Sequence, residues 1–404
     1  MKYLILVGDG MGDLPLAELQ GRTPLEAADT PAMDFLCRHG ELFRTRTIPE
    51  GYPPGSDVAN LSLLGYRPEE CYTGRAPLEA ASLGVELGEN EIACRCNLVT
   101  LDRSSGREVI MRDYSAGHIT TEEARILVET LERELGNEKI RFHAGVGYRH
   151  LLVFRGDLGD LATVPPHDYT GRDVGPFRER YLAIPELAEL LPRAEAILAD
   201  HPVNRQRLAV GKNPANSIWL WGEGRPPVME TIPTRYGISG ALISAVDLLK
   251  GLGVCAGLDI IRVEGATGYL DTNYQGKAEA ALKALVDHDL VFVHVEAPDE
   301  AGHQGLLREK IQAIEDFDHR IVGPIHQGLT RLPGRPDFRL VVAMDHFTPI
   351  SLRTHTALPV PTLLFDSRKT GPGCGLTYTE KNGAENGSIL ENGEDFFRRL
   401  LERR

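Results

Sequence analysis

Carboxylates and imidazoles recur where apolar segments of strand length come to an end. Six side chains share this placement, the last of them in a nearby loop flanked by prolines: Asp9, Asp299, His303, Asp345, His346 and His355. Taken singly, each histidine of this kind is more often a satisfied loop or core residue than a ligand. The carboxyl ends of parallel strands lie side by side at one edge of a sheet, so the six could converge on one small region. Six oxygen and imidazole ligands would suit two divalent ions such as Mn²⁺ or Zn²⁺.

One serine stands where a rigid loop passes into a helix. The segment Gly51–Asn60 holds two glycines and two prolines ahead of Ser56, and apolar residues at helical spacing follow it. Such a serine exposes its Oγ near free backbone N–H groups, although a lone serine at this place is more often an N-cap. Two ions about 3.5–4 Å apart favour displacement at phosphorus, and a metal bound to the Oγ would lower its pKa. The combination predicts phosphoryl transfer through a phosphoserine at Ser56.

The composition restricts the partners and the compartment. The chain has 404 residues, 42% of them hydrophobic and 25% charged, and its formal net charge is −14. This acidic balance argues against nucleic acid or an anionic membrane as a partner, because a basic surface is needed to bind either. The first apolar run is too short for a signal sequence and leads into an acidic turn, so we expect a cytoplasmic protein. The six cysteines are dispersed and form neither a zinc pattern nor a disulfide framework.

The elements that must position these residues are of two kinds. Up to residue 88, buried-strand and helix patterns alternate around a glycine-rich turn, as in an α/β fold. Between residues 89 and 204, strand patterns of a different character surround a helix with a capping-box start at Thr120. From residue 205 the α/β pattern returns. We therefore predict an α+β domain over residues 89–204, inserted into an α/β domain formed by residues 1–88 and 205–404.

Several motifs of the chain, taken together, resemble those of one enzyme family. They are Gly8-Asp-Gly-Met-Gly, Pro54-Gly-Ser-Asp-Val-Ala-Asn-Leu-Ser-Leu-Leu-Gly-Tyr66, Thr73-Gly-Arg-Ala-Pro-Leu-Glu-Ala, Pro298-Asp-Glu-Ala-Gly-His303, Asp345-His346 and His355-Thr-Ala-Leu-Pro-Val-Pro361. Over essentially its whole length the chain resembles the archaeal-type, cofactor-independent phosphoglycerate mutases of the alkaline phosphatase superfamily. This resemblance implies an alkaline-phosphatase-like three-layer sandwich with a mostly parallel sheet and an inserted α+β cap domain.

The resemblance also implies two metal ions held by two sets of side chains. One set is Asp299, His303 and His355, and the other is Asp9, Ser56, Asp345 and His346. The ions would most readily be Mn²⁺, with Zn²⁺, Co²⁺ or Mg²⁺ as alternatives. Ser56 would take the phosphoryl group from 3-phosphoglycerate and return it to the 2-hydroxyl of the bound glycerate, without 2,3-bisphosphoglycerate as a cofactor.

By the same resemblance, residues of the inserted domain would bind the carboxylate and phosphate of this small phosphorylated three-carbon acid. His118 resembles a substrate histidine of the wider mutase family, and Arg149 resembles a substrate arginine. Lys212 stands where the family has a lysine near the phosphoryl group, although a plain surface position fits Lys212 equally well.

The motifs leave three alternative functions open. A metal-dependent phosphomonoesterase would differ in letting water reach the phosphoserine, which an inserted cap would oppose. A homoserine kinase-like phosphotransferase would not need a Gly-rich ATP loop, which the sequence lacks, if it used the phosphoserine route. A metal-binding protein without activity would be expected to have lost the nucleophile or a ligand, and none is missing. The sequence also leaves a homo-oligomer open.

Overall fold

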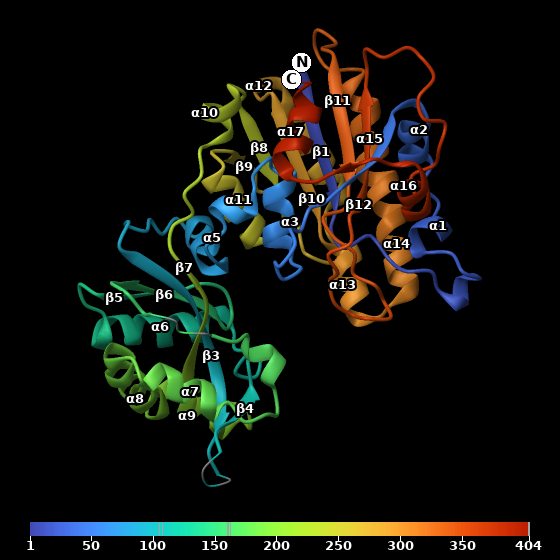
Figure 1. The fold of residues 1–404 in the computed structure, drawn as a ribbon. Coiled ribbons are helices and arrows are strands. Elements are labelled where there is room, and N and C mark those ends of the chain that lie inside the picture. Colours follow the sequence, from blue (N-terminus) through green and yellow to red (C-terminus); the bar gives the residue numbers. More distant parts are fainter. Residues whose placement is uncertain (105, 107, 160, 162, 403–404) are drawn as a thin grey trace. The chain divides into compact units, whose positions relative to one another are not determined.

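The computed structural model describes residues 1–402 except 105, 107, 160 and 162 (Figure 1). The chain folds into two compact units, which we call unit 1 (Met1–Tyr72 with Val228–Arg404) and unit 2 (Thr73–Pro227). Unit 2 is therefore an insertion in unit 1, with its ends at residues 73 and 227 instead of 89 and 204. The physical reason is that strand β7 (Ser217–Gly224) pairs with β3 (Glu91–Asp102), and helix α5 (Arg75–Ser82) contacts both strands.

In the described part of unit 1, eight strands form one sheet in the order β13-β2-β12-β11-β1-β10-β8-β9. Their bounds are β1 Lys2–Gly8, β2 Glu41–Thr45, β8 Gly240–Ile243, β9 Asp259–Ile260, β10 Leu290–Val295, β11 Phe338–Ala343, β12 Val360–Asp366 and β13 Ile389–Leu390. Only β12 runs against its neighbours, since its pairings with β11 and β2 are antiparallel and every other pairing in this sheet is parallel. The predicted mostly parallel sheet is confirmed.

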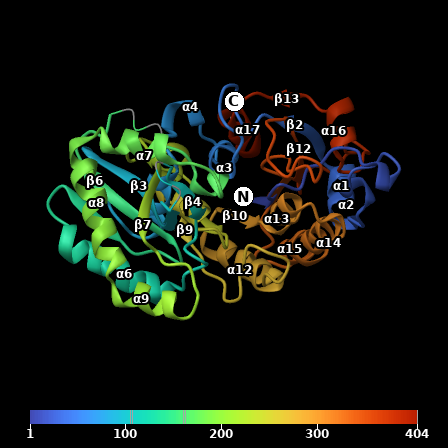
Figure 2. The same ribbon diagram turned by 90° about the horizontal axis from the view of Figure 1, so that it is seen from below.

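Helices cover both faces of this sheet, as Figures 1 and 2 show. Those of unit 1 are η1 Ala17–Leu19, α1 Pro24–Ala27, α2 Pro31–His39, α3 Ser56–Leu63, α4 Pro68–Cys71, α10 Ile232–Tyr236, α11 Asp247–Cys255, α12 Tyr274–Asp287, α13 Ala297–Gln304, α14 Leu307–Phe317, the π-helical η3 Asp318–Val322, α15 Gly323–Leu329, α16 Glu380–Asn386 and α17 Gly393–Leu401. Within the described residues, no helix is both long and apolar enough to cross a membrane.

The central strand β1 shows why the sequence forms this layered structure. Its residues Leu4 to Val7 are fully buried, as expected for a parallel strand covered on both faces. Leu4 and Leu6 join a core that includes Phe317 of α14, whereas alternation along the strand points Ile5 to the opposite face. Unit 1 is thus a three-layer α/β sandwich, as predicted.

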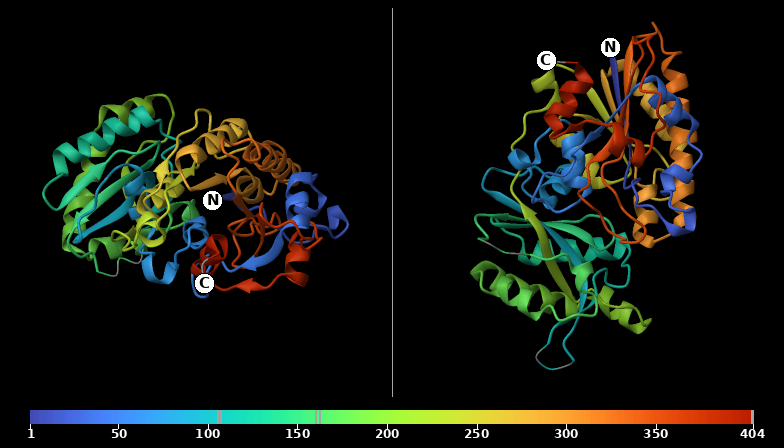
Figure 3. Two further views of the ribbon diagram at one scale, coloured as in Figure 1. Left: turned by 90° about the horizontal axis from the view of Figure 1, so that it is seen from above. Right: turned by 45° about the vertical axis from the view of Figure 1, so that its right-hand side comes forward.

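Unit 2 is an α+β structure with an antiparallel sheet (Figure 3). Its strands are β3, β4 Ile110–Asp113, β5 Ile140–His143, β6 Arg149–Arg155 and β7, and its helices are α5, α6 Thr121–Leu135, η2 Pro166–Tyr169, α7 Gly175–Leu182, α8 Pro185–Ala199 and α9 Pro202–Ala209. The apolar stripes of α6 and α8 form one core with the sheet. Thr120 caps α6 through a capping box with Glu123, as predicted.

Candidate metal and nucleophile site

Three neighbouring parallel strands bring predicted ligands to one edge of the unit 1 sheet. The register places the last residues of β1, β10 and β11 side by side. The segments that follow carry Asp9 after β1, Asp299 and His303 on α13 after β10, and Asp345 and His346 after β11. Asp299 and His303 are four residues apart on a helix, so their side chains lie on the same face. The convergence follows from strand topology alone.

Asp9, Asp345 and His346 form a first group suited to a metal ion. His346 Nε2 lies 3.4 Å from Asp9 Oδ1 and 3.5 Å from Asp345 Oδ2. The Oγ of Ser56 lies 3.2 Å from the same nitrogen, and Ser56 is the first residue of helix α3. The three ligand side chains are buried, whereas Ser56 is half-buried. The predicted nucleophile therefore adjoins the group and retains contact with solvent.

Asp299, His346 and His355 form a second group, so His346 belongs to both. His355 Nε2 lies 3.4 Å from Asp299 Oδ1, and His303 Nε2 lies 3.2 Å from Asp299 Oδ2. The structure thus brings together all the side chains that the sequence suggested for the metals and the nucleophile.

The tautomers of two histidines provide a test of whether a metal fits. His303 Nδ1 lies 3.0 Å from the carbonyl oxygen of Arg353, and His355 Nδ1 lies 3.3 Å from that of Pro54. A carbonyl only accepts, so both Nδ1 atoms carry hydrogen and, in the neutral rings, both Nε2 atoms offer lone pairs. These Nε2 atoms are 2.8 Å apart. Two lone pairs at this distance repel each other unless a proton or a metal ion lies between them, and imidazole nitrogens beside carboxylates fit a divalent metal ion.

The charges of the site support the same conclusion. Burial, and then the nearby carboxylates of Asp345 and Asp299, raise the pKa of Asp9 well above its usual range. Burial also opposes ionisation of Asp299, but the adjacent rings of His303 and His355 outweigh it and hold the pKa of Asp299 well below its usual range. Clustered buried carboxylates repel one another unless positive charge lies among them.

Sequence reasoning missed several residues that hold these ligands in place. Asn60 Nδ2 donates to Asp345 Oδ2 and to the Ser56 carbonyl, both at 2.8 Å. Asn60 lies one helical turn after Ser56, within a motif quoted above. This spacing places both side chains on the same face of the helix and could have identified Asn60. Gly10 has a φ of 57°, and a Cβ there would collide with the side chain of Asp299. The turn after β1 therefore needs glycine both for its conformation and for its close approach.

His294 is a further buried neighbour of the first group that the sequence did not single out. Its Nε2 lies 3.0 Å from Asp9 Oδ2, and its side chain is fully buried at the end of β10. Burial lowers the pKa of His294 to about 4. Its apolar flanks give it the appearance of a core residue, so periodicity alone does not distinguish it.

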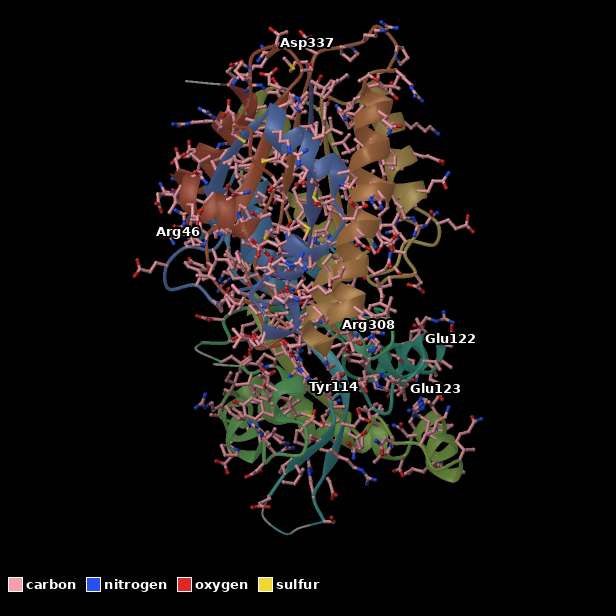
Figure 4. All side chains as sticks on the ribbon, turned by 90° about the vertical axis from the view of Figure 1, so that its right-hand side faces the viewer. Arg46, Tyr114, Glu122, Glu123, Arg308 and Asp337 are labelled. Carbon is pink, nitrogen blue, oxygen red and sulfur yellow. The ribbon has the colours of Figure 1, made fainter. Side chains whose placement is uncertain are left out.

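The predicted substrate residues lie in unit 2, on exposed loops and at a strand end. His118 has a φ of 48°, which is uncommon for residues other than glycine, Lys212 follows α9, and Arg149 opens β6. Arg207 is buried and donates to carbonyls of both the loop that carries His118 and the loop that carries Lys212. Arg207 also pairs with Glu123, labelled in Figure 4, so the two loops are held side by side at the start of α6.

Unit 2 also contains a buried arginine that the sequence analysis did not identify. Arg95 on β3 lies over the ring of Trp221, 3.9 Å from its centroid, and its Nε is 3.0 Å from a carboxylate oxygen of Glu79. Burial, together with Arg75 and Arg149, lowers the pKa of Arg95 to about 10 against the opposite effect of Glu79. Arg75 and Arg95 share the Glu79 carboxylate, and two guanidinium groups on one carboxylate leave positive charge to spare, which suits an anionic ligand.

Comparisons with known proteins agree on one family. A family profile described as 2,3-bisphosphoglycerate-independent phosphoglycerate mutase matches residues 37–204. The chain is 51% identical over 404 residues to the "Probable 2,3-bisphosphoglycerate-independent phosphoglycerate mutase" of Geobacter sulfurreducens, with 100% of both chains covered. It is 51% identical over 390 residues to a 2,3-bisphosphoglycerate-independent phosphoglycerate mutase of Methanosarcina acetivorans, with 96% of each covered. A solved cofactor-independent phosphoglycerate mutase from Thermoplasma acidophilum is similar with a TM-score of 0.66 and 27% identity, covering 100% of this chain and 99% of that one.

Proposed function

This chain belongs to the family of 2,3-bisphosphoglycerate-independent phosphoglycerate mutases, and from that premise we propose that it interconverts 3-phosphoglycerate and 2-phosphoglycerate through a phosphoserine at Ser56. The observation that carries the proposal is the position of the Ser56 Oγ, 3.2 Å from His346 Nε2 and beside two contiguous groups of ligands, all of them buried except the half-buried His355. A serine hydroxyl in this setting is suited to attack phosphorus.

The chain's own residues define the two halves of the reaction. The Ser56 Oγ forms a bond to phosphorus while the bond between phosphorus and the C3 oxygen of the substrate breaks. The C2 oxygen of the bound glycerate then takes the same phosphoryl group back, and the Oγ–P bond breaks. Asn60 holds the backbone of Ser56 and the carboxylate of Asp345 in one arrangement, so the nucleophile and a ligand keep their spacing in both halves.

Two divalent ions would be held by the two sets of side chains expected from the sequence, which overlap the two groups described above. Asp299, His303 and His355 would bind one ion, and Asp9, Ser56, Asp345 and His346 the other. Bound there, the ions would supply positive charge that favours the ionised serine hydroxyl and the phosphoryl oxygens. We propose Mn²⁺, because imidazole and carboxylate ligands are mixed in both groups, and Zn²⁺, Co²⁺ and Mg²⁺ are the ions to compare.

We further propose that His118, Arg149 and Lys212 bind the anionic groups of the substrate. The positive charge of Arg149 helps to lower the pKa of Arg95. This excess of positive charge in unit 2 supports an anion-binding role for Arg149. We also propose that the enzyme is cytoplasmic. Its net charge of −14 argues against nucleic acid as a partner. Light scattering will show whether it is a homo-oligomer.

An enolase-coupled assay of 3-phosphoglycerate turnover tests the function. Protein loaded with Mn²⁺ and given no 2,3-bisphosphoglycerate should form 2-phosphoglycerate and release little free phosphate. Phosphate release at the full rate would show a phosphomonoesterase instead, and phosphorylation of homoserine by ATP would show a kinase. The relatives described above are named as mutases and do not favour either alternative.

A further inference from the structure

We propose that the hydroxyl of Thr348 is a positioning group that fixes His346 as an Nε2 ligand and ties it to Asp299, which belongs to the second metal group. The inference rests on the two-metal site proposed above. Thr348 lies outside the predicted ligand set and outside the motifs that indicated it.

Thr348 connects the two groups through a single buried oxygen. Its Oγ1 lies 2.5 Å from Asp299 Oδ1 and 3.2 Å from His346 Nδ1. The residue is fully buried, so water does not compete for the hydroxyl. The bridge therefore runs from a carboxylate of one group to the shared imidazole.

The chemistry of these partners sets the direction of both hydrogen bonds. The ionised carboxylate of Asp299 only accepts, so the Thr348 hydroxyl must donate its hydrogen to Asp299. The oxygen of Thr348 is then left to accept, and His346 Nδ1 must carry the hydrogen. His346 Nε2 is consequently the lone-pair nitrogen, and this is the atom that faces Asp9, Asp345 and Ser56.

This assignment completes a pattern shared by the three histidines of the site. The Nδ1 atoms of His303 and His355 face backbone carbonyls, which leaves their Nε2 atoms free to bind a metal. Of the three histidines, His346 alone has a side chain as the partner of its Nδ1 atom. A side-chain partner can be removed by substitution without changing the backbone, so this one link is open to experiment.

The structure around Thr348 holds its oxygen at this position. Lys310 is fully buried and donates to the Thr348 carbonyl at 2.7 Å, to the Gly12 carbonyl at 3.0 Å and to Asp13 at 2.9 Å. The ammonium group thereby fastens the loop after β11 to the loop after β1. On the other side, a Cβ at Gly302 would lie 2.6 Å from the Thr348 carbonyl oxygen, so glycine permits the close approach of α13.

The test compares two variants that differ by the hydroxyl. Thr348→Ala removes the hydroxyl and Thr348→Ser retains it; valine is avoided because a methyl group in place of Oγ1 would clash with Asp299. The metal-free full chain is titrated with Mn²⁺, and free Mn²⁺ is measured by electron paramagnetic resonance. T348A should weaken binding at both sites by about 10–100-fold, and T348S should stay within about threefold of the wild type.

Thr45→Ala is the matched control, since it removes another fully buried hydroxyl of unit 1, one that lies 2.9 Å from Thr362 Oγ1. T45A should bind Mn²⁺ as the wild type does. The inference is overturned if T348A binds both ions normally, or if T348S is as weak as T348A. A wild-type chain that binds no Mn²⁺ would refute the metal site itself.

A measurement on the wild type covers the case in which T348A does not fold. Nitrogen NMR of the metal-free protein with labelled imidazoles should show hydrogen on Nδ1 of His346, assigned by the signal lost in His346→Gln. Hydrogen on Nε2 would overturn the proposal.

Discussion

The two units assemble their candidate functional residues by different physical means. In unit 1, buried ligands follow the ends of adjacent parallel strands and contact one another directly. In unit 2, the predicted residues are exposed on loops and a strand end, and the buried Arg207 holds two of those loops together. Both groups suited to a metal among the described residues lie in unit 1. We therefore expect the reaction centre in unit 1 and the binding of charged groups in unit 2.

The difference between the two units indicates which contacts must be rigid. Ligands that share a cation need fixed positions. Burial holds the ligands in place, and so do hydrogen bonds from neighbours such as Asn60. Anion-binding arginines act through charge and long side chains, so they tolerate exposure and loop positions. Substitutions in unit 1 should therefore change kcat or metal content, and those in unit 2 should change KM.

The largest effect is expected from Ser56→Ala. The substitution removes the nucleophile, so kcat in the enolase-coupled assay should fall by roughly 10⁴-fold or more. The other ligands of its group are buried and remain in place, so metal content measured by mass spectrometry should stay close to the wild-type value. Activity retained by this variant would rule out the phosphoenzyme route.

A second large effect should come from His303→Ala. The variant loses an imidazole that lies 3.2 Å from Asp299 Oδ2, so one of two bound ions should be lost and kcat should fall about 10³-fold. His288→Ala is the control, because His288 also pairs with an aspartate of unit 1, Asp259 at 2.9 Å, at the amino ends of β9 and β10 and not at the carboxyl ends that carry the site. Equal metal content in the two variants would contradict the assignment of His303 as a metal ligand.

The extent to which the sequence predicted each unit follows the same physical division. In a parallel sheet, strand ends align without knowledge of the register, so Asp9, Asp299 and Asp345 could be placed together from apolar runs alone. In an antiparallel sheet, a residue's neighbours depend on register and pairing partners. The contact of Arg95 with Trp221 depends on the pairing of β3 with β7, which the predicted domain boundary at residue 204 had separated. Lys310 was missed because two of its three acceptors are backbone carbonyls, which leave no pattern in a sequence. Thr348 was missed because its hydroxyl meets Asp299, 49 positions away in the sequence, only in the folded chain.

A medium effect, confined to binding, is expected from Arg149→Ala. Loss of a charge-assisted hydrogen bond of about 1.5–3 kcal/mol should raise KM for 3-phosphoglycerate roughly 10–100-fold and change kcat little. Arg155→Ala is the matched control, since Arg155 is an exposed arginine at the other end of the same strand, β6. A KM for the Arg149→Ala variant equal to that of the wild type would show that Arg149 does not bind the substrate.

The smallest effect concerns the stability of unit 1 behind its site. Glu380 accepts hydrogen bonds from the Asp13 N–H at 3.2 Å and from the Thr23 hydroxyl at 2.7 Å, and burial raises its pKa from an ordinary 4.5 to about 7. A raised carboxyl pKa means that the folded state holds the proton more tightly than the unfolded state. The stabilisation is therefore complete below pH 4.5 and is lost as the pH rises to about 7.

Glu380→Gln cannot titrate, so it should remove this pH dependence. Between pH 4.5 and 7 the free energy of unfolding of the wild type should fall, relative to that of the variant, by about 1–3 kcal/mol. Urea unfolding at pH 5 and pH 8 measures the free energy of unfolding of both proteins. The test compares how much this free energy changes between the two pH values in each protein. Metal content should be the same in both, because Glu380 contacts Asp13 and Thr23 and not a ligand. If the free energies of unfolding of the two proteins change with pH in the same way, Glu380 is already ionised in the folded protein and holds no proton in this pH range.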